Sequence, residues 1–329
     1  MCSAGTSFLN GIFSLLMANN IVKKKHVVTE LLCLVFKCMF FLFHLLYSIH
    51  MLKLPEDKLN IRLIALDLDD TLLNDERTID DDTVAALRSA AEKGIYIVLC
   101  SGRAEDGILP FVRRLEVAGM ETGRFIIAIN GCSVFDMHER KQIYLKSVES
   151  DVLLHVNREA ESAGLKTEVY SPDVIFYAEE TKWTRLDVDL CKVKGQVVED
   201  YGKFIADGKF PKMLVPGEPE KLLVLQDKLK KELGNRAVIF TSKPYFLEIL
   251  PPECGKGEAI EFLAEKLGIP MEQTMGFGDS MNDETMIRQC GYSVAMSNGL
   301  DYIKDIASFV TRFDNNNDGI ADFIENFVL

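Results

Sequence analysis

Two carboxylates at the end of an apolar run are the first residues in this chain with clear chemical potential. The run Ile61–Leu66 leads directly into the sequence DLDDT at positions 67–71. Asp67 and Asp69 are two apart, so in a regular strand their side chains would point to opposite faces. For both to serve one site, the chain must turn at about Asp69, or one residue must contribute its backbone carbonyl. Carboxylates held together repel each other, and Mg²⁺, which takes oxygen ligands, would offset that repulsion. The alternative is an acidic surface turn after a strand.

Other residues of this kind follow at intervals along the chain. They are Ser101-Gly102-Arg103 after a second apolar run, Asn130-Gly131 after a third, Lys256 at the start of a helical pattern, and Gly-Asp-Ser-Met-Asn-Asp at 278–283. Each has an ordinary explanation, because Ser101 could cap a helix, Lys256 could be solvated, and a Gly-Asp pair could form a turn. Together, in this order and each at a strand end or a helix start, they form a specific set.

The elements that must position this set alternate between strand and helix. Apolar runs at 61–66, 95–100 and 125–129 predict strands buried on both faces, typical of a parallel sheet covered by helices. An amphipathic helix at 84–93 lies between the first two and stops at Gly94. Such alternation builds a parallel sheet with right-handed crossovers. We therefore predict an α/β fold with a Rossmann-like, doubly wound parallel sheet, whose carboxyl edge carries the polar set.

The pattern changes between residues 143 and 250. Two long helical patterns lie at 147–164 and 218–234, with strand-like runs at 165–170, 174–179, 210–215, 237–241 and 245–250. This arrangement predicts an inserted α+β cap, an antiparallel sheet with helices on one face. The strand–helix alternation resumes at about residue 251. The expected organisation is an N-terminal extension at 1–50, a core at 51–142 and 251–329, and a cap at 143–250.

Composition narrows the class of protein. The net charge of −13 over 329 residues argues against a nucleic-acid binder, which would present a basic face. The eight cysteines are scattered without a C-x-x-C pair, which predicts reduced thiols rather than a disulfide framework or a zinc site. These features fit a cytoplasmic enzyme, which would need a locally positive pocket to bind small anionic substrates.

The first fifty residues differ from the rest of the chain. Residues 31–49 are almost wholly apolar, interrupted by Lys37 and His44, and are long enough to cross a bilayer. A membrane is therefore a partner only if residues 27–50 are a genuine transmembrane segment, in which case 31–49 would anchor the protein. The alternatives are a signal-like or amphipathic appendage, or upstream sequence not normally part of the protein, with Met51 as the working start. Residues 1–50 are left out of the fold prediction.

The motifs resemble those of the haloacid dehalogenase superfamily: D-x-D-x-T, S/T, K and G-D-x-x-N-D. They are most similar to the Cof-type, class IIB phosphatases, which act on sugar phosphates and related metabolites. The matching segments are LIALDLDDTLL, CSGR, ING, PYFLEILPPECGKGEAI, GFGDSMNDETMI and VAMSNG. The resemblance covers residues 61–329 and none of 1–50. Gly255 departs from the pattern, since the family usually has Asn or Ser before the Lys-Gly pair, but the lysine assignment is unaffected.

The resemblance implies catalytic roles for four residues. Asp67 would be the nucleophile that forms an aspartyl-phosphate. Asp69 would protonate the leaving oxygen and then deprotonate the hydrolytic water. Ser101 and Lys256 would stabilise the charge on the transferring phosphoryl group.

The resemblance also implies a Mg²⁺ cofactor and a phosphate-binding set. Mg²⁺ would be held by Asp67, the backbone carbonyl of Asp69, and Asp279, with Asp283 orienting these ligands. The substrate-binding residues would be Ser101, Gly102, Lys256 and Asn282.

The position of the insertion sets the expected subclass. Few residues separate Asp67 from Ser101, and many separate Ser101 from Lys256, so the cap lies between the second and third motifs and is of the C2B type. A mobile cap would close over the site and select the substrate. Tyr170, Lys182 and Tyr245 are candidates for that selection. The predicted function is Mg²⁺-dependent hydrolysis of small phosphorylated metabolites.

Three alternatives stay open at this point. A phosphomutase-like phosphotransferase would use the same fold. A receiver-like signalling domain also combines an acidic cluster, Ser/Thr and Lys, but it has no cap. Residues Asp314 to Glu325 fit the spacing of a calcium-binding EF-hand loop, with Gly319 at its sixth position. An EF-hand needs a helix on each side, however, and residues 308–311 predict a strand.

Overall fold

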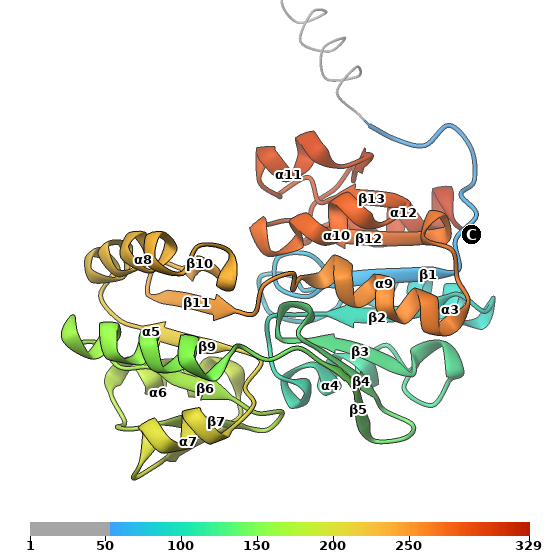
Figure 1. Cartoon of the computed structure of the whole chain (residues 1–329). Helices are drawn as coiled ribbons and strands as arrows, with labels where there is room; N and C mark the ends of the chain where they lie inside the picture. The colour runs from blue at the N-terminus through green and yellow to red at the C-terminus, as the bar shows by residue number, and fades with distance from the viewer. Residues whose placement is uncertain (1–52) are drawn as a thin grey trace, which may run out of the picture. The chain divides into compact units, whose positions relative to one another are not determined.

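A computed structural model describes residues 53–329, and these contain two β-sheets (Figure 1). The first sheet has the strand order β14-β13-β12-β1-β2-β3-β4-β5. Its strands are β1 (Leu63–Asp67), β2 (Tyr96–Cys100), β3 (Phe125–Ala128), β4 (Ser133–Asp136), β5 (Lys141–Leu145), β12 (Thr274–Gly278), β13 (Tyr292–Ala295) and β14 (Phe309–Val310). All pairings from β14 to β3 are parallel, while β3–β4 and β4–β5 are antiparallel. β1 therefore lies in the interior of the sheet, between β2 and β12.

Helices cover both faces of this sheet, as the buried strands require. They are α3 (Asp81–Glu92), α4 (Glu105–Arg114), α9 (Lys256–Leu267), α10 (Glu284–Gln289), α11 (Asp301–Ile306) and α12 (Gly319–Phe327). The period-two alternation of β1 separates the faces. Ile64 and Leu66 pack with residues of α3, α4 and α12, whereas Leu63 and Ala65 pack with residues of α9 and α10. The predicted doubly wound α/β core is confirmed.

The second sheet belongs to the inserted segment and has the order β10-β11-β9-β6-β7-β8. Its strands are β6 (Glu168–Tyr170), β7 (Val174–Tyr177), β8 (Lys194–Val197), β9 (Met213–Pro216), β10 (Val238–Lys243) and β11 (Phe246–Leu250). Its helices are α5 (Ser150–Ser162), α6 (Lys182–Cys191), α7 (Tyr201–Asp207) and α8 (Pro219–Leu233). Every pairing is antiparallel except β7–β8. The α+β cap that the sequence predicted is therefore present.

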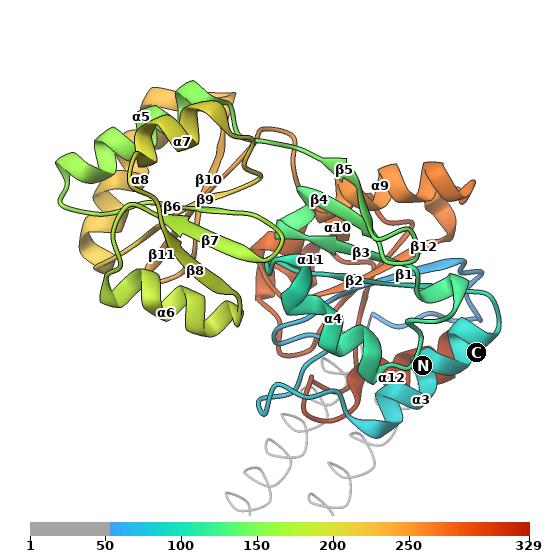
Figure 2. The ribbon, with the colours of Figure 1, turned by 90° about the horizontal axis from the view of Figure 1, so that it is seen from below.

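The expectation that the cap helices share one face was wrong. Residues of α5, α7 and α8 pack together in one cluster with one face of the cap sheet. Residues of α6 pack against Tyr170, Ile175 and Tyr177 on the other face. Figure 2 shows α6 on the side of the sheet opposite to α5 and α8. The sequence pattern missed α6 because both of its buried residues, Thr184 and Asp187, are polar.

The first sheet extends through residue 145 and so includes the first three residues of the expected cap, 143–145. Its last two strands, β4 and β5, form an antiparallel hairpin that ends at Leu145. β5 shows no buried residue, so it carries little of the apolar alternation that predicts a strand. The chain passes from the first sheet to the cap through residues 146–149 and returns through residues 251–255.

Two predictions concern the whole chain, and the structure tests them only for residues 53–329. The five cysteines at positions 100, 132, 191, 254 and 290 are free, as the scattered spacing predicted. Within residues 53–329, no helix combines the length and apolar character needed to cross a membrane. The apolar segment at 31–49 lies outside the described residues, so its role as a membrane anchor stays a prediction, as does the cytoplasmic location.

Candidate active site

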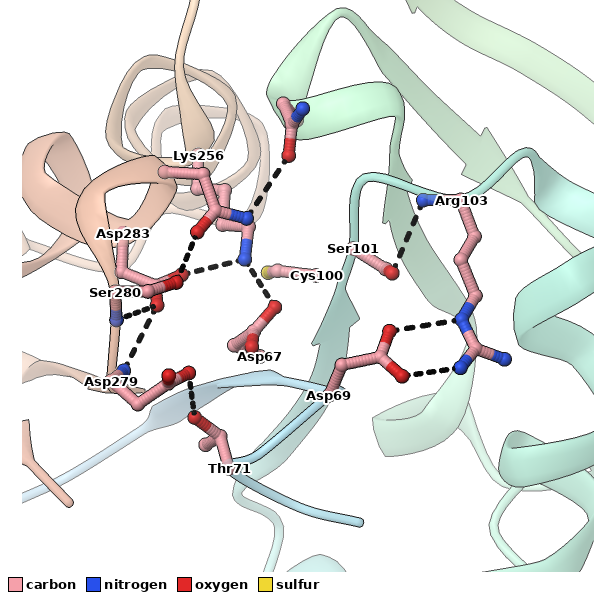
Figure 3. Close-up of polar contacts among 12 residues, drawn as sticks. Asp67, Asp69, Thr71, Cys100, Ser101, Arg103, Lys256, Asp279, Ser280 and Asp283 are labelled. Carbon is pink, nitrogen blue, oxygen red and sulfur yellow. Dashed lines mark hydrogen bonds and ion pairs between the residues drawn. The ribbon is translucent and has the colours of Figure 1, made fainter. Parts of the chain in front are cut away.

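Asp67 is the last residue of β1 and lies at the carboxyl edge of the first sheet (Figure 3). Its side chain is buried, and one of its oxygens, Oδ1, accepts a hydrogen bond from the Lys256 ammonium. Burial is the main cause that raises the pKa of the Asp67 carboxyl well above its usual value, and the nearby charge of Asp283 adds to it. Asp67 is thus held in a low-polarity position where its ionised form depends on neighbouring cations.

Lys256 is the first residue of α9, and its side chain is fully buried. Besides Asp67 it contacts Asp283, with 2.6 Å between Lys256 Nζ and Asp283 Oδ1. Burial alone would lower the pKa of the Lys256 ammonium, but Asp283 and Asp67 together raise it above its usual value. The lysine is therefore a permanent positive charge between two carboxylates.

The loop after β12 supplies the other two carboxylates of the site. Asp283 Oδ2 accepts hydrogen bonds from the backbone N–H groups of Asp279 (2.9 Å) and Ser280 (3.1 Å), which fixes the loop in a tight turn. A Cβ at Gly278 would lie 2.6 Å from the Asp283 side chain, so only glycine leaves room for this turn. Thr71 donates a 2.9 Å hydrogen bond to Asp279 Oδ1. Burial, and next the charge of Asp283, raises the pKa of Asp279 to about 7.

These carboxylates form a set that could hold a metal ion. Asp67, Asp279 and Asp283 each offer one oxygen, and these three atoms lie within 4.8 Å of one another. All three side chains are buried, and burial, together with the nearby charge of Asp283, raises the pKa values of Asp67 and Asp279. A hard divalent cation with oxygen ligands would offset the charge of these carboxylates, so the donor set fits a divalent metal ion.

The Asp69 side chain is turned away from this cluster. The chain bends directly after it, at Asp70, which has a positive φ of 63°. Nearly half of the Asp69 side chain is exposed (48%), and it forms a bidentate ion pair with Arg103 at 2.5 and 3.1 Å. The Arg103 guanidinium also lies over the Phe111 ring, 5.2 Å from its centre. Figure 3 shows the two neighbouring aspartates facing different partners.

The remaining predicted residues surround the same edge of the sheet. Ser101 follows β2 directly and is buried, and its Oγ accepts a 3.2 Å hydrogen bond from the Arg103 backbone N–H. Ser101, Gly102 and Asn282 all line one cavity of about 420 Å³ with Asp67 and the Asp279 loop. Lys256 is fully buried and does not line the cavity, but its ammonium contacts Asp67, which does. The structure thus brings every predicted site residue to one place, where Asp69 also lines the cavity but directs its carboxylate at Arg103.

The cap contributes the opposite wall of the cavity. Its lining residues there are Asp187, Leu190, Cys191, Lys212, Phe240, Thr241, Ser242, Lys243, Phe246 and Glu248. None of the three candidates for substrate selection lines the cavity. Tyr170 is buried and donates a hydrogen bond to Asp187, Lys182 is 74% exposed, and Tyr245 stacks on Trp183.

Sequence reasoning missed Arg103, Lys212 and Glu248 as site residues. Arg103 was visible as the fourth residue of the CSGR segment, and its cation could have been paired with the acidic run at 67–70. Lys212 and Glu248 lie within or next to apolar strand runs of the cap. A charged residue in an otherwise apolar strand was the available signal, because a buried charge needs a partner.

The EF-hand alternative does not match the elements around residues 314–325. The element before this loop is the short strand β14 rather than a helix. The loop also binds the turn after β1, since Asn315 Nδ2 donates to the Leu73 carbonyl (2.9 Å) and Asn316 Oδ1 accepts from the Asp75 backbone N–H (2.9 Å). Within residues 53–329, neither group of side chains close enough to share a metal ion includes this loop.

A buried aspartate at the end of an interior parallel strand, a buried lysine and a carboxylate loop define a hydrolase-type α/β site beneath an inserted cap. Residues 64–324 match the haloacid dehalogenase-like hydrolase family. This match covers most of the chain, and the protein belongs to that family, as its motifs predicted.

Individual relatives agree with this placement. The chain is 28% identical over 285 residues to the 5-amino-6-(5-phospho-D-ribitylamino)uracil phosphatase YcsE of Bacillus subtilis, covering 84% of this chain and all of that protein. A crystal structure of a haloacid dehalogenase-like hydrolase from Bacteroides thetaiotaomicron is 30% identical and has a TM-score of 0.73, with 80% of this chain and 98% of that one covered. A sugar phosphatase of subclass IIB has a TM-score of 0.68 at 21% identity, covering 80% of this chain and 98% of that one, and at this identity it supports the fold alone.

Proposed function

We propose that the protein is a Mg²⁺-dependent phosphatase that hydrolyses small phosphorylated metabolites through an aspartyl-phosphate on Asp67. The observation that carries the proposal is the placement of Asp67, buried at the end of β1, with Oδ1 held by Lys256 and a carboxylate cluster beside it. One oxygen of Asp67 is thereby fixed and the other is left to attack. The named phosphatase among the relatives supports the same reaction class.

In the first step, an Asp67 oxygen attacks the phosphorus of the ester. A P–O bond to Asp67 forms as the P–O bond to the leaving group breaks, and the leaving oxygen takes a proton from Asp69. A carboxylate in a bidentate ion pair holds no proton, so Asp69 must separate from Arg103 and take up a proton from solvent before it can act as the acid. General acid–base groups contribute about 10²–10⁴-fold in rate.

In the second step, water attacks the phosphorus of the aspartyl-phosphate and gives its proton to Asp69. The P–O bond to Asp67 breaks, phosphate leaves, and both aspartates return to their starting states. The Lys256 ammonium and the Ser101 hydroxyl are suited to stabilise the phosphoryl oxygens in both steps. Positioning and charge stabilisation of this kind account for most of the catalysis of phosphoryl transfer.

The metal would be held by Asp67 and Asp279, with the Asp69 backbone carbonyl as a further ligand. Asp283 lies within the same cluster, and its hydrogen bonds to the Asp279 and Ser280 backbone keep the loop in place. Bound Mg²⁺ would supply positive charge to offset the carboxylates and the phosphoryl oxygens.

The cap would restrict the substrate to a small molecule. A cavity of about 420 Å³ suits a phosphorylated metabolite and is too small for a macromolecule. Its walls combine charged and hydroxyl side chains with few aromatic ones, which favours a polar leaving group. The subclass of sugar-phosphate phosphatases, predicted from the motifs, agrees with such a cavity.

The test is a screen of the purified protein with phosphate monoesters, including p-nitrophenyl phosphate, sugar phosphates and nucleotides. We expect release of phosphate with Mg²⁺ and none in excess EDTA. Equal hydrolysis of p-nitrophenyl phosphate in EDTA would refute the metal requirement. Transfer of the phosphoryl group to a second sugar without net phosphate release would indicate the phosphotransferase alternative.

A further inference from the structure

The turn after β3 is strained in a way that the catalytic residues do not explain. Ile129, Asn130 and Gly131 have consecutive positive φ angles of 51°, 53° and 92°. A positive φ is a genuine outlier for a β-branched residue such as Ile129, and each such residue costs on the order of 1–3 kcal/mol. Backbone strain of this kind persists only where the surrounding structure imposes it, so contacts made by the turn must hold it in this conformation.

The side chain that this turn presents belongs to Asn130, which is buried between the core and the cap. Asn130 Nδ2 donates a 3.1 Å hydrogen bond to Glu248 Oε2, on β11 of the cap. Asn130 Oδ1 accepts a 3.3 Å hydrogen bond from Asn282 Nδ2, in the loop that carries Asp279 and Asp283. A Cβ at Gly102 would lie 3.0 Å from Asn130 Oδ1, so the glycine after Ser101 leaves the space that this side chain occupies.

The chemistry of the partners fixes the direction of these hydrogen bonds. An ionised carboxylate accepts only, so the amide NH₂ of Asn130 must face Glu248 and its oxygen must face Asn282. Asn282 then donates through its own NH₂ and has its oxygen free, and Ser280 Oγ donates to that oxygen at 2.7 Å. The result is one continuous chain in which each amide has a single allowed orientation.

Both ends of the chain are anchored by charged groups. At the cap end, Lys212 Nζ lies 3.3 Å from Glu248 Oε2, the same oxygen that Asn130 contacts. At the core end, the Ser280 backbone N–H donates to Asp283 Oδ2. Among residues 53–329, the Asn130–Glu248 contact is also the single side-chain hydrogen bond between the cap sheet and the core.

We propose that Asn130 is a positioning residue that couples the cap to the Gly278–Asp283 loop. By binding Glu248 and Asn282 together, it lets closure of the cap set the orientation of the loop that holds Asp279. This inference rests on the proposed phosphatase function. It adds that the cap contributes to turnover through the loop, in addition to any contact it makes with the substrate.

Three single variants separate positioning from structure. Asn130→Gly removes the side chain and adopts the left-handed backbone without strain, so its thermal stability should not fall through backbone effects. Glu248→Ala removes the partner in the cap. Glu248→Gln is the conservative variant, because one amide oxygen in the place of Oε2 can still accept from both Asn130 and Lys212. Lys228→Ala, which breaks an exposed ion pair with Glu159 in the cap, is the matched control.

The expected result is a fall in kcat of about ten- to a hundredfold for Asn130→Gly and Glu248→Ala, the size expected for one charge-assisted hydrogen bond. The fall should be similar with p-nitrophenyl phosphate and with the best natural-type ester, since the loop serves both. KM should change little. Glu248→Gln should restore most of the activity lost in Glu248→Ala, and Lys228→Ala should match the wild type.

The double variant Asn130→Gly/Glu248→Ala gives the decisive comparison. The effects of substitutions within one hydrogen-bonded chain are not additive. The double variant should therefore lose about as much kcat as either single variant. Losses that multiply, or a rise in KM with unchanged kcat for Asn130→Gly, would overturn the coupling and leave the proposed function standing. A wild-type protein that hydrolyses no phosphate ester with Mg²⁺ would overturn the proposed function, and the coupling with it.

Discussion

Two buried clusters in this molecule contain the same numbers of acidic and basic side chains, but their charges are stabilised in different ways. Each contains one lysine and three carboxylates. The core cluster comprises Lys256, Asp67, Asp279 and Asp283, and the cap cluster comprises Lys212, Glu168, Asp187 and Glu248. In both, negative charge exceeds positive charge at a depth where an unpaired ion is costly.

The carboxylates of the two clusters differ in the partners that surround them. In the core, three carboxylate oxygens lie within 4.8 Å of one another, an arrangement that a cation stabilises. In the cap, Asp187 accepts from the Tyr170 hydroxyl, and both Glu168 oxygens are buried without a hydrogen-bond partner. Burial, followed by the charge of Asp187, raises the pKa of Glu168 well above its usual value. The core cluster thus has the donor set for a divalent metal ion, whereas the raised pKa of Glu168 favours a proton on the cap cluster.

The largest effect is expected from breaking the core cluster at its nucleophile. Asp67→Asn removes the attacking oxygen and a metal ligand, so turnover should fall by at least about 10⁴-fold. No phosphoenzyme should be trapped by acid quench in the presence of substrate and Mg²⁺. Glu168→Gln removes one carboxylate from the cap cluster and is the matched control, which should form phosphoenzyme normally. A phosphoenzyme in Asp67→Asn would assign the nucleophile to another residue.

Asp69 provides a second test because it lies beside the core cluster, while its carboxylate pairs with Arg103. Asp69→Asn keeps the backbone carbonyl but cannot carry the proton, so kcat should fall by roughly 10²–10⁴-fold on an alkyl sugar phosphate. The loss should be much smaller on p-nitrophenyl phosphate, whose leaving group hardly needs protonation. The measurement is kcat for both esters with one preparation of enzyme. Equal losses would mean that Asp69 is not the general acid.

The two lysines should differ in their effect on stability and in their response to metal. Lys256→Met leaves three buried carboxylates without a cation, and breaking a buried ion pair costs about 3–5 kcal/mol. Mg²⁺ should recover part of that loss, and by more than it stabilises the wild type. Lys212→Met should cost less, because Asn130 still donates to Glu248, and Mg²⁺ should give it only the wild-type increment. Thermal unfolding in EDTA and in Mg²⁺ measures both, and equal metal increments in the two variants would contradict the distinction.

The smallest effect concerns the proton in the cap cluster. Folded protein holds the Glu168 proton to a higher pH than unfolded protein, whose pKa is near the ordinary value of 4.5. The folded state therefore loses stability relative to the unfolded state as the pH rises above that value. Glu168→Gln cannot titrate, so it should be more stable than the wild type at pH 8, by up to about 1–3 kcal/mol, and equal to it near pH 4. If the difference in stability were constant across that range, the pKa of Glu168 would not be raised in the folded protein.

The core cluster could be predicted from the sequence because parallel strands bring their ends together. Asp67, Ser101 and Asp279 each follow an apolar run, and a parallel sheet places such residues at one edge whatever the details of packing. The pairing of the Asp69 side chain with Arg103 could not be predicted, since it depends on Arg103 reaching across from the neighbouring loop.

The cap cluster could not be predicted for a geometric reason. Strand residues alternate between the two faces of a sheet, so the sequence places Glu168 and Glu248 on a face without saying whether helices, solvent or the core cover it. That depends on α6, whose buried positions, Thr184 and Asp187, are both polar. The partners of Lys212 and Asn130 are then set by how antiparallel strands from distant parts of the chain pair, which no local pattern specifies.

The two segments that connect the cap to the core are tied to each other. Lys146, just after β5, donates to the backbone carbonyl of Glu253, on the returning segment, and its own backbone N–H donates to the Cys132 carbonyl at 2.8 Å. The inserted module thus leaves and rejoins the core at neighbouring points, and the strand order of the first sheet does not depend on it. A short loop could replace it without re-threading the core, so natural variation or engineering can exchange the whole module while the phosphoryl-transfer machinery is retained.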